Sequence, residues 1–229
     1  MAGHSLKDAV VAVIGASGAL GSLIAQEVSR RGGHLVLVGR DRERLDAVQI
    51  DGAVRVVADL GDAAAGEKVV HAAQEEHGRL DGVINAAGVV AFGNLADTSD
   101  EVIEELFLTN VIGPLWLIRR VKQALADSRG FVVNVSAVVA DQPMPGMAAY
   151  SASKAALTGA DRALVRELRR DKISVYDVRP PHTETGLVDR AIAGQAPKLP
   201  EGLSPETVAA AIVNAIEQGQ LDVPADDIS

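Results

Sequence analysis

The feature that most restricts the fold of this chain is a regular alternation of short apolar runs with longer segments of helical periodicity. The first run, Val10–Ile14, is apolar at every position, which is typical of a strand buried on both faces. Further strands are expected at 35–38, 54–57, 83–84, 131–135 and 173–178, and helices at 19–31, 42–48, 63–77, 99–126, 150–170 and 207–218. The helical stretch at 99–126 is expected to be interrupted by Gly113-Pro114. This alternation predicts an α/β fold with a doubly wound parallel sheet and helices on both faces. We expect a single domain over residues 1–229, because no change in composition marks a linker.

Composition and charge exclude several classes of function. Apolar residues make up 48% and charged residues 23%, which is usual for a soluble globular protein. The net charge of -9 disfavours a nucleic-acid or anionic-membrane surface, since both need clustered positive charge. The chain has no cysteine, its start at Met1–Val10 is unlike a signal peptide, and no apolar stretch approaches the roughly 18 residues of a membrane span. We expect a cytoplasmic enzyme or binding protein with a small-molecule partner, no nucleic acid and no membrane.

Residues 180–205 form the one long stretch without clear periodicity, and they hold five of the nine prolines. A loop of this size in a compact domain is usually functional, so we expect a lid-like segment at about 181–205. Its apolar residues, with two methionines ahead of Tyr150, indicate either an apolar pocket or packing of the segment onto the body: Leu187, Val188, Ile192, Leu199, Met144 and Met147. His182 is either a substrate or cofactor contact or, as we favour, a surface histidine.

A glycine-rich loop separates the first expected strand from the first expected helix. From Gly15 to Gly21 it reads Gly-Ala-Ser-Gly-Ala-Leu-Gly. Small residues let a backbone approach a pyrophosphate, and the N-terminus of the following helix offers free N–H donors. A tight strand–helix turn is the alternative. The position after the first strand favours a Rossmann-like dinucleotide site, with these contact residues: Gly15, Ser17, Gly18, Leu20 and Gly21.

The end of the second expected strand distinguishes between nicotinamide cofactors. NAD-binding chains usually place an acidic residue there for the ribose hydroxyls, whereas this strand ends Gly39-Arg40. Arg40 suits a 2′-phosphate, with help from Ser17. The alternative is a solvated basic loop, since Asp41 and Glu43 alternate with the arginines. We therefore expect NADP(H) as the preferred cofactor and NAD(H) as the alternative.

Tyr150 and Lys154 form the most informative pair in the sequence. Positions i and i+4 of a helix share a face, so the phenol and the ammonium project side by side. A free tyrosine has a pKa of about 10, and a neighbouring cation lowers it. Such a pair suits proton transfer to or from an alcohol or carbonyl oxygen. For so short a pattern the alternative is a half-buried tyrosine beside a solvated lysine.

Five motifs follow one another in order along the chain: the glycine loop, Asp59-Leu60, Asn85-Ala86-Ala87-Gly88, Asn110 and Tyr150 with Lys154. Together they resemble the short-chain dehydrogenase/reductase family in its classical form, over nearly the whole chain. The resemblance implies an NAD(P)-dependent dehydrogenase or reductase. It also implies a homodimer or homotetramer, assembled through the two long middle helices.

The resemblance further implies a role for each matching residue. Asn110 would hold a water in a proton relay through Lys154, and Lys154 would bind the nicotinamide ribose and lower the pKa of Tyr150. Tyr150 would pass the proton as hydride moves between nicotinamide and substrate. The other matches would contact the adenine, line the loop beside the cofactor or touch the nicotinamide end: Asp59, Leu60, Asn85, Ala86, Gly88, Pro180, Thr183 and Thr185. Without the family, Asn85 fits a turn, Asp59 a strand-end cap and Asn110 a kink ahead of Gly113-Pro114.

Three positions around the expected cofactor depart from the family's pattern. Ile14 stands where the family usually has threonine, and Pro181 stands where glycine usually follows Pro180. The glycines follow a two-and-two spacing, with Ala19 in the usual place of the middle glycine. That spacing occurs in the extended branch of the family, which makes an epimerase or dehydratase a third hypothesis. It is disfavoured because little of the chain follows Gln218.

The fourth departure concerns catalysis. The family's catalytic serine lies thirteen residues before the tyrosine, and this position is Ala137. Ser136 sits one residue earlier, and successive strand residues point to opposite faces. Ser136 therefore either takes the catalytic role through a local distortion or is structural. Losing a hydroxyl donor to a reacting oxygen costs on the order of 10²–10³ in rate.

The sequence thus predicts an NADP(H)-dependent oxidoreductase acting on an alcohol/carbonyl pair, with Tyr150 as general acid/base. The rival hypothesis is a nucleotide-binding sensor or scaffold with weak or no catalysis, and Ala137 motivates it. No metal site is expected, because the five histidines lack metal-ligand spacing. Trp116 lies in an apolar helix and indicates core or subunit interface rather than substrate stacking.

Overall fold

Seven parallel strands form one sheet within residues 3–228, the part of the chain that this computed structural model describes. The sheet order is β3-β2-β1-β4-β5-β6-β7, so the direction of winding reverses between β1 and β4. The strands are β1 (Val10–Ile14), β2 (His34–Gly39), β3 (Val54–Val57), β4 (Gly82–Asn85), β5 (Phe131–Val135), β6 (Ser174–Val178) and β7 (Asp222–Val223). This is the doubly wound, Rossmann-like sheet that the alternating pattern predicted, with helices on both faces.

The predicted number of six strands was wrong, because β7 was missed. β7 has two residues, which is too short for a periodic signal. It pairs in parallel with β6, with Asp222 opposite Asp177 and Val223 opposite Val178. The edge strand therefore places an acidic side chain next to the buried end of β6.

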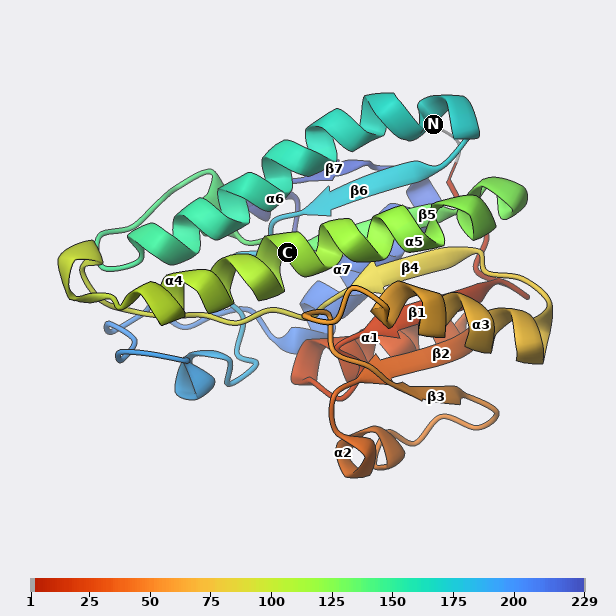
Figure 1. Ribbon diagram of the computed structural model, residues 1–229, viewed down its shortest axis with the longest axis horizontal. Coiled ribbons are helices and arrows are strands. Elements are labelled where there is room, and N and C mark those ends of the chain that lie inside the picture. The colour runs from red at the N-terminus through yellow and green to blue at the C-terminus, as the bar shows by residue number, and fades with distance from the viewer. Residues whose placement is uncertain (1–2, 229) are drawn as a thin grey trace.

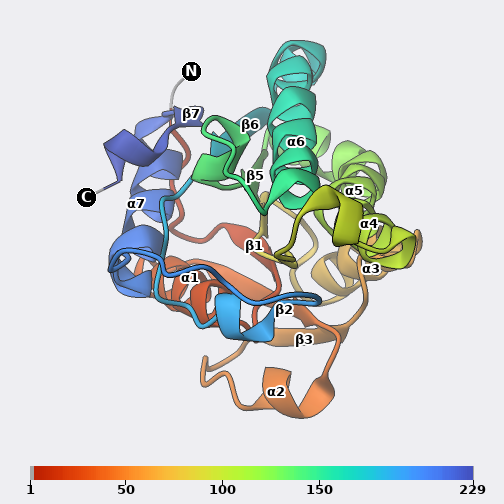
Figure 2. The same ribbon diagram turned by 90° about the vertical axis from the view of Figure 1, so that its left-hand side faces the viewer.

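Two groups of helices cover the two faces of the sheet (Figures 1 and 2). The longer helices are α1 (Ala19–Arg30), α3 (Ala65–His77), α5 (Gly113–Ser128), α6 (Ala148–Glu167) and α7 (Pro205–Gln218), and the short ones are α2 (Arg42–Asp46) and α4 (Asp100–Phe107). Alternate residues of β1 point to opposite faces: Val11 and Val13 pack with α1 and α7, and Val10 and Ala12 pack with α3 and α5. No helix within residues 3–228 combines the length and apolarity needed to cross a membrane.

The helical run between β4 and β5 is continuous, whereas the sequence predicted an interruption at Gly113-Pro114. α4 passes through a π-helical turn at Leu108–Ile112 directly into α5. Gly113 and Pro114 directly follow this π-helical turn, where the regular i→i−4 hydrogen bonds are already interrupted, so the missing N–H of Pro114 does not end the helix. Single π turns often occur at functional sites, and this one contains Asn110.

The 181–205 segment crosses the edge of the sheet where the strands end (Figures 1 and 2). It contains a short 3-10 helix, Val188–Arg190. Two isolated bridges hold it, one between Ala91 and Ala193 and one between Thr183 and Leu203. The segment lacks periodicity, yet its backbone is tied to the loop that follows β4.

Candidate active site

A cavity of about 590 Å³ lies at the carboxyl ends of the strands, within the size range of small-molecule sites. It is lined from the loops after β1, β2, β3, β4, β5 and β6, beside the point where the strand order reverses, which is where doubly wound sheets bind ligands. Most of the predicted site residues meet here: Gly15, Ser17, Gly18, Leu20, Gly21, Arg40, Asp59, Leu60, Ala86, Gly88, Ser136, Tyr150, Lys154, Pro180, Thr183 and Thr185. The structure places Asn85 and Asn110 behind the wall instead.

The glycine loop has the backbone geometry that a phosphate cradle needs. Gly15 has a φ of +77°, a conformation that favours glycine, and its carbonyl accepts a 2.9 Å hydrogen bond from the Gly18 N–H. A Cβ on Gly21 would lie 2.2 Å from the Gly15 carbonyl oxygen, so the third glycine lets α1 approach the strand end. Gly18 caps α1 without a side-chain hydrogen bond. The first N–H groups of the helix therefore face the cavity without a capping side chain, which fits a phosphate group.

Gly21→Ala is expected to destabilise the protein by about 1–3 kcal/mol, the usual cost of overpacking. The new methyl group would meet backbone atoms of Gly15, which move only if α1 shifts. The matched control is Gly159→Ala in α6, where an added Cβ meets nothing within 4 Å. We expect the control to gain roughly 0.5–1 kcal/mol from helix propensity. Urea unfolding of both variants checks this, and equal free energies of unfolding would contradict the close approach of α1.

A cationic corner lies where β2 ends. The Arg40 guanidinium is 3.8 Å from the Asp59 carboxylate, and the two side chains are 65% and 54% exposed. Arg44 donates a 3.1 Å hydrogen bond to the carbonyl of Ser17 and also lines the cavity. Both arginines therefore sit beside the glycine loop with free donors, and Arg44 adds a basic group to the predicted Arg40 contact.

Tyr150 and Lys154 lie on the buried face of α6, as the i, i+4 spacing predicted, and are 6% and 5% exposed. The Lys154 ammonium donates a 3.0 Å hydrogen bond to the carbonyl of Val135. Burial lowers the pKa of Lys154 to about 8, against the opposing charges of Asp177 and Asp161.

Burial also raises the pKa of Tyr150, which is the opposite of the expected lowering by Lys154. The reason is that the buried phenolate loses its hydration, while the nearby ammonium is itself disfavoured by burial. The phenol of Tyr150 is therefore held in its protonated form.

Asn85 and Asn110 shape the loop that follows β4. Asn110 accepts a 3.0 Å hydrogen bond from the Val89 N–H and donates a 2.9 Å one to the Val89 carbonyl. Asn85 accepts from the Ala87 N–H at 3.2 Å, as a turn residue would. A Cβ on Gly88 would lie 3.3 Å from the Lys154 ammonium. The side-chain amides of Asn85 and Asn110 thus hold the backbone at Gly88, which has no side chain, close to the Lys154 ammonium.

The side chains of Ser136 and Ala137 lie in different surroundings. The Ser136 hydroxyl, in a residue 4% exposed, donates a 3.1 Å hydrogen bond to the main-chain carbonyl of Lys154 and lies 3.1 Å from the Thr158 hydroxyl. Ala137 is extended, with φ −166° and ψ 158°, and lines the cavity. The contacts of Ser136 are therefore those of a structural residue, one of the two alternatives that the sequence left open.

The cavity near Tyr150 has an apolar wall from two segments. Of the six apolar residues that the sequence singled out, five line it: Met144, Met147, Leu187, Val188 and Leu199. Ile192 packs beneath this wall, in the cluster that contains Tyr150. His182 also lines the cavity, with its Nε2 atom 3.3 Å from the Glu184 carboxylate.

A buried charged group behind β6 was missed by sequence reasoning. Asp161, Asp177 and Arg179 are all less than 4% exposed. Burial raises the pKa of Asp161, whose Oδ2 atom has no partner in the described protein. The signal was present, since Asp177 lies in a strand expected to be buried and Arg179 directly follows that strand, and buried charges need partners. Residues 3–228 contain no cluster of acidic and histidine side chains suited to a metal ion.

Comparison with known proteins shows which family the chain belongs to. The pattern of the short chain dehydrogenase family matches residues 9–196. This chain belongs to that family. An uncharacterized oxidoreductase of Staphylococcus epidermidis is 29% identical to this short chain dehydrogenase over 217 residues, 93% of each chain. Dehydrogenase/reductase SDR family member 7B of Xenopus laevis is 33% identical over 238 residues, which cover 93% of this chain and 72% of the relative.

A solved structure resembles this short chain dehydrogenase along most of its length. It is a short chain dehydrogenase from Burkholderia cenocepacia in complex with NADP. The TM-score is 0.85 and the identity 25%, over 97% of this chain and 90% of the other. The family, the oxidoreductase class and the Rossmann-like fold that the ordered motifs predicted are therefore confirmed.

Proposed function

We propose that this protein is an NADP(H)-dependent oxidoreductase that interconverts a small alcohol and its carbonyl compound. The observation that carries the proposal is that one cavity contains both the glycine loop and the Tyr150–Lys154 pair. The family supports an oxidoreductase, and the related Burkholderia cenocepacia structure, described with NADP, supports the cofactor class.

The residues around the cavity fit a nicotinamide dinucleotide. Such a cofactor supplies or accepts the hydride when it is bound. The loop Gly15–Gly21 and the N-terminus of α1 would hold the pyrophosphate, Asp59 and Leu60 would contact the adenine, and Lys154 would bind the nicotinamide ribose. The end of β6 and the start of the 181–205 segment would complete the nicotinamide side: Pro180, Thr183 and Thr185.

Burial raises the pKa of Tyr150, so its phenol is protonated before carbonyl reduction and could act as the general acid in that direction. The phenol would donate its proton to the substrate oxygen, and the Lys154 ammonium would stabilise the phenolate that remains. Both N–H groups of the Asn110 amide are used, by Val89 and by Ser153. A relay water there would therefore bind an acceptor, either the amide oxygen or a main-chain carbonyl of the π-helical turn. We assign no chemical step to Ser136.

Arg40→Ala is expected to weaken NADPH binding roughly tenfold and to leave NADH binding unchanged. The reason is that Arg40 lies at the cavity where a 2′-phosphate would sit, with no more than a 3.8 Å ion pair to Asp59. The matched control is Arg42→Ala, since Arg42 pairs with Asp46 at 4.0 Å and lines no part of the cavity. Fluorescence titration of the three proteins measures this, and an equal loss for NADPH and NADH would refute the phosphate contact.

The proposed activity is tested by incubating the protein with NADPH and a panel of aldehydes and ketones. Loss of NADPH absorbance with any member, matched by alcohol formation, is the expected result. Unchanged NADPH absorbance with every member of the panel, together with tight NADPH binding, would instead support the rival hypothesis of a nucleotide-binding sensor or scaffold. Ala137 is the residue that motivates this rival.

We also infer how the whole chain is organised in the working enzyme. Residues 1–229 would act as one dinucleotide-binding and catalytic domain, with the 181–205 segment as its lid. The apolar side chains of Ile112, at the end of the π-helical turn, and Leu115, in α5, are 39% and 37% exposed and suit a face between copies of the chain. Sedimentation of the purified protein would distinguish a homodimer or homotetramer from a monomer.

A further inference from the structure

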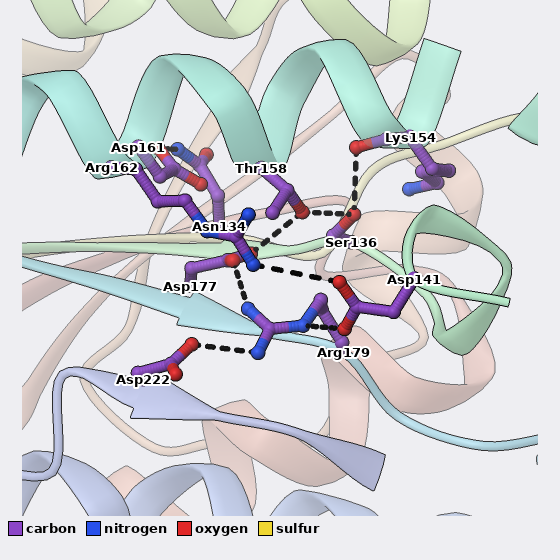
Figure 3. A network of polar contacts seen from close by, with 10 residues as sticks. All are labelled: Asn134, Ser136, Asp141, Lys154, Thr158, Asp161, Arg162, Asp177, Arg179 and Asp222. Carbon is purple, nitrogen blue, oxygen red and sulfur yellow. Dashed lines mark hydrogen bonds and ion pairs between the residues drawn. The ribbon is translucent and has the colours of Figure 1, made fainter. Parts of the chain in front are cut away.

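The Arg179 guanidinium is buried among three carboxylates from three different segments (Figure 3). Its side chain is 3% exposed. Nε donates to Asp141 at 2.5 Å, Nη2 pairs with Asp222 at 2.7 Å, and Nη1 pairs with Asp177. We call these four residues the Arg179 cluster. A guanidinium presents its donors in a fixed planar fork, so three carboxylates around it are fixed in direction as well as in distance.

The position of Arg179 in the chain connects the cluster to the cavity. Arg179 follows the last residue of β6 and directly precedes Pro180, where the wall formed by the 181–205 segment begins. Asp141 follows the 3-10 helix Val138–Ala140, whose first residues line the opposite wall. The Val138 N–H also donates a 2.9 Å hydrogen bond to the Pro180 carbonyl. The cluster therefore joins two walls of the cavity at their common base.

A second set of contacts extends the cluster to α6. Thr158 donates a 3.1 Å hydrogen bond to Asp177, and its hydroxyl lies 3.1 Å from that of Ser136. Ser136 in turn donates to the main-chain carbonyl of Lys154 (Figure 3). This chain of groups does not carry protons to the ammonium of Lys154, because it ends on a carbonyl oxygen. Its effect is on position: it holds the start of the wall after β5 against the helix that bears Tyr150.

Arg179 keeps its charge under all ordinary conditions. Burial alone would lower its pKa, but the hydrogen bond to Asp222 and the charges of Asp177, Asp222 and Asp141 raise it above the usual value. Arg179 therefore gives the cluster a permanent positive charge. Burial raises the pKa of Asp177, and the charge of Arg179 opposes this shift.

We propose that Arg179 is a positioning residue, which acts through Asp141 to hold the wall formed by residues 137–141 against the base of the 181–205 segment. The effect on the wall is independent of any activity. Its consequence for substrate affinity rests on the proposed function. A cluster that served only general stability would have no particular effect on the wall formed by residues 137–141.

Asp141 and Asp222 provide a matched pair for the test. Both meet the same guanidinium at similar distances, 2.5 and 2.7 Å, and both are at least partly exposed, 38% and 70%. Asp141 belongs to a cavity wall, whereas Asp222 belongs to the edge strand β7. The substitutions Asp141→Asn and Asp222→Asn remove the same charge with the same change in shape. Arg162→Met is a third variant, because it removes the other partner of Asp141, at 3.5 Å, without touching Arg179.

Hydrogen–deuterium exchange of the full chain, read at the Val138 amide, decides the proposal. Asp141→Asn is expected to speed exchange about tenfold, the factor that 1.4 kcal/mol of lost local stability produces. Asp222→Asn and Arg162→Met are expected to leave it within about twofold of the original protein. Equal acceleration in both Asn variants, or none in Asp141→Asn, would overturn the proposal. So would acceleration in Arg162→Met.

Two further measurements separate positioning from a loss of folding. Asp141→Glu keeps the charge and is expected to restore exchange to within about threefold of the original rate. If Asp141→Glu exchanges as fast as Asp141→Asn, a role for the ion pair between Arg179 and Asp141 is contradicted. With NADPH and hexanal as the probe, Asp141→Asn is expected to raise KM about fivefold with the Kd for NADPH unchanged, and Asp222→Asn to change neither. If the original protein does not reduce hexanal, the proposed function is questioned for that substrate, while the exchange result still decides the role of Arg179.

Discussion

Tyr150→Phe is expected to lower kcat by about 10²–10⁴-fold, the usual contribution of a positioned general acid. The variant removes one oxygen atom from a side chain that is 6% exposed and lines the cavity beside Lys154. The Ser153 hydroxyl donates a 2.8 Å hydrogen bond to the main-chain carbonyl of Tyr150, and this bond is kept in the variant. We therefore expect the melting temperature and the Kd for NADPH to stay close to those of the original protein. Steady-state kinetics with a carbonyl that the original protein reduces gives the comparison.

The chain offers its own control, since it has two tyrosines. Tyr176 is buried in β6, and its hydroxyl donates a 3.2 Å hydrogen bond to the Ile216 carbonyl on α7, away from the cavity. Tyr176→Phe should cost about 1 kcal/mol of stability and leave kcat unchanged. If the two variants lose kcat to a similar extent, or Tyr150→Phe retains full turnover, the assignment of Tyr150 as the acid is refuted.

Ala137→Ser is expected to raise kcat by about 10²–10³-fold, the size of the effect that one hydroxyl donor has on a developing oxyanion. Ala137 lines the cavity and is extended, so a serine side chain there meets no backbone strain. The neighbouring Ser136 does not offer this donor, because its hydroxyl already bonds to the Lys154 carbonyl. The prediction is measured as kcat with the same carbonyl and NADPH.

Ala137→Val separates the donor from mere bulk at this position. Valine fills at least as much space as serine and has no hydroxyl, so kcat is expected to stay at or below the original value. A serine variant no faster than the original protein would mean that no donor is missing. Turnover would then depend on Tyr150 and Lys154 alone.

The fold was accessible from sequence because β-branched strands and helical periodicity are strong local signals. β1, β3 and β5 were predicted with their observed bounds, since apolar runs end sharply at charged or small residues there. β7 was missed because two residues carry no periodicity. The π-helical turn at Leu108–Ile112 was also missed, because it leaves the helical pattern almost unchanged and shifts only the hydrogen bonds.

Part of the candidate site could be predicted from the sequence for the same reason. Local motifs gave the glycine loop and the Tyr150–Lys154 pair, and the meeting of strand ends brings them into one cavity. The burial of individual side chains could not be predicted from the sequence, and burial determines whether the pKa of Tyr150 is raised or lowered. The partners of Arg179 were hidden too, because Asp141, Asp177 and Asp222 come from segments far apart in the chain and meet only through the parallel pairing of β6 with its neighbours.

The most direct test of the proposed cofactor site is a parallel titration of the purified protein with NADPH and NADH, followed by nucleotide fluorescence. We expect both nucleotides to bind and NADPH to bind more tightly, because Arg40 and Arg44 line the cavity. Tighter binding of NADH would keep the dinucleotide site and contradict the phosphate contact. Binding of neither nucleotide at millimolar concentration would mean that the glycine loop is only a turn, and the proposed oxidoreductase activity would be contradicted with it.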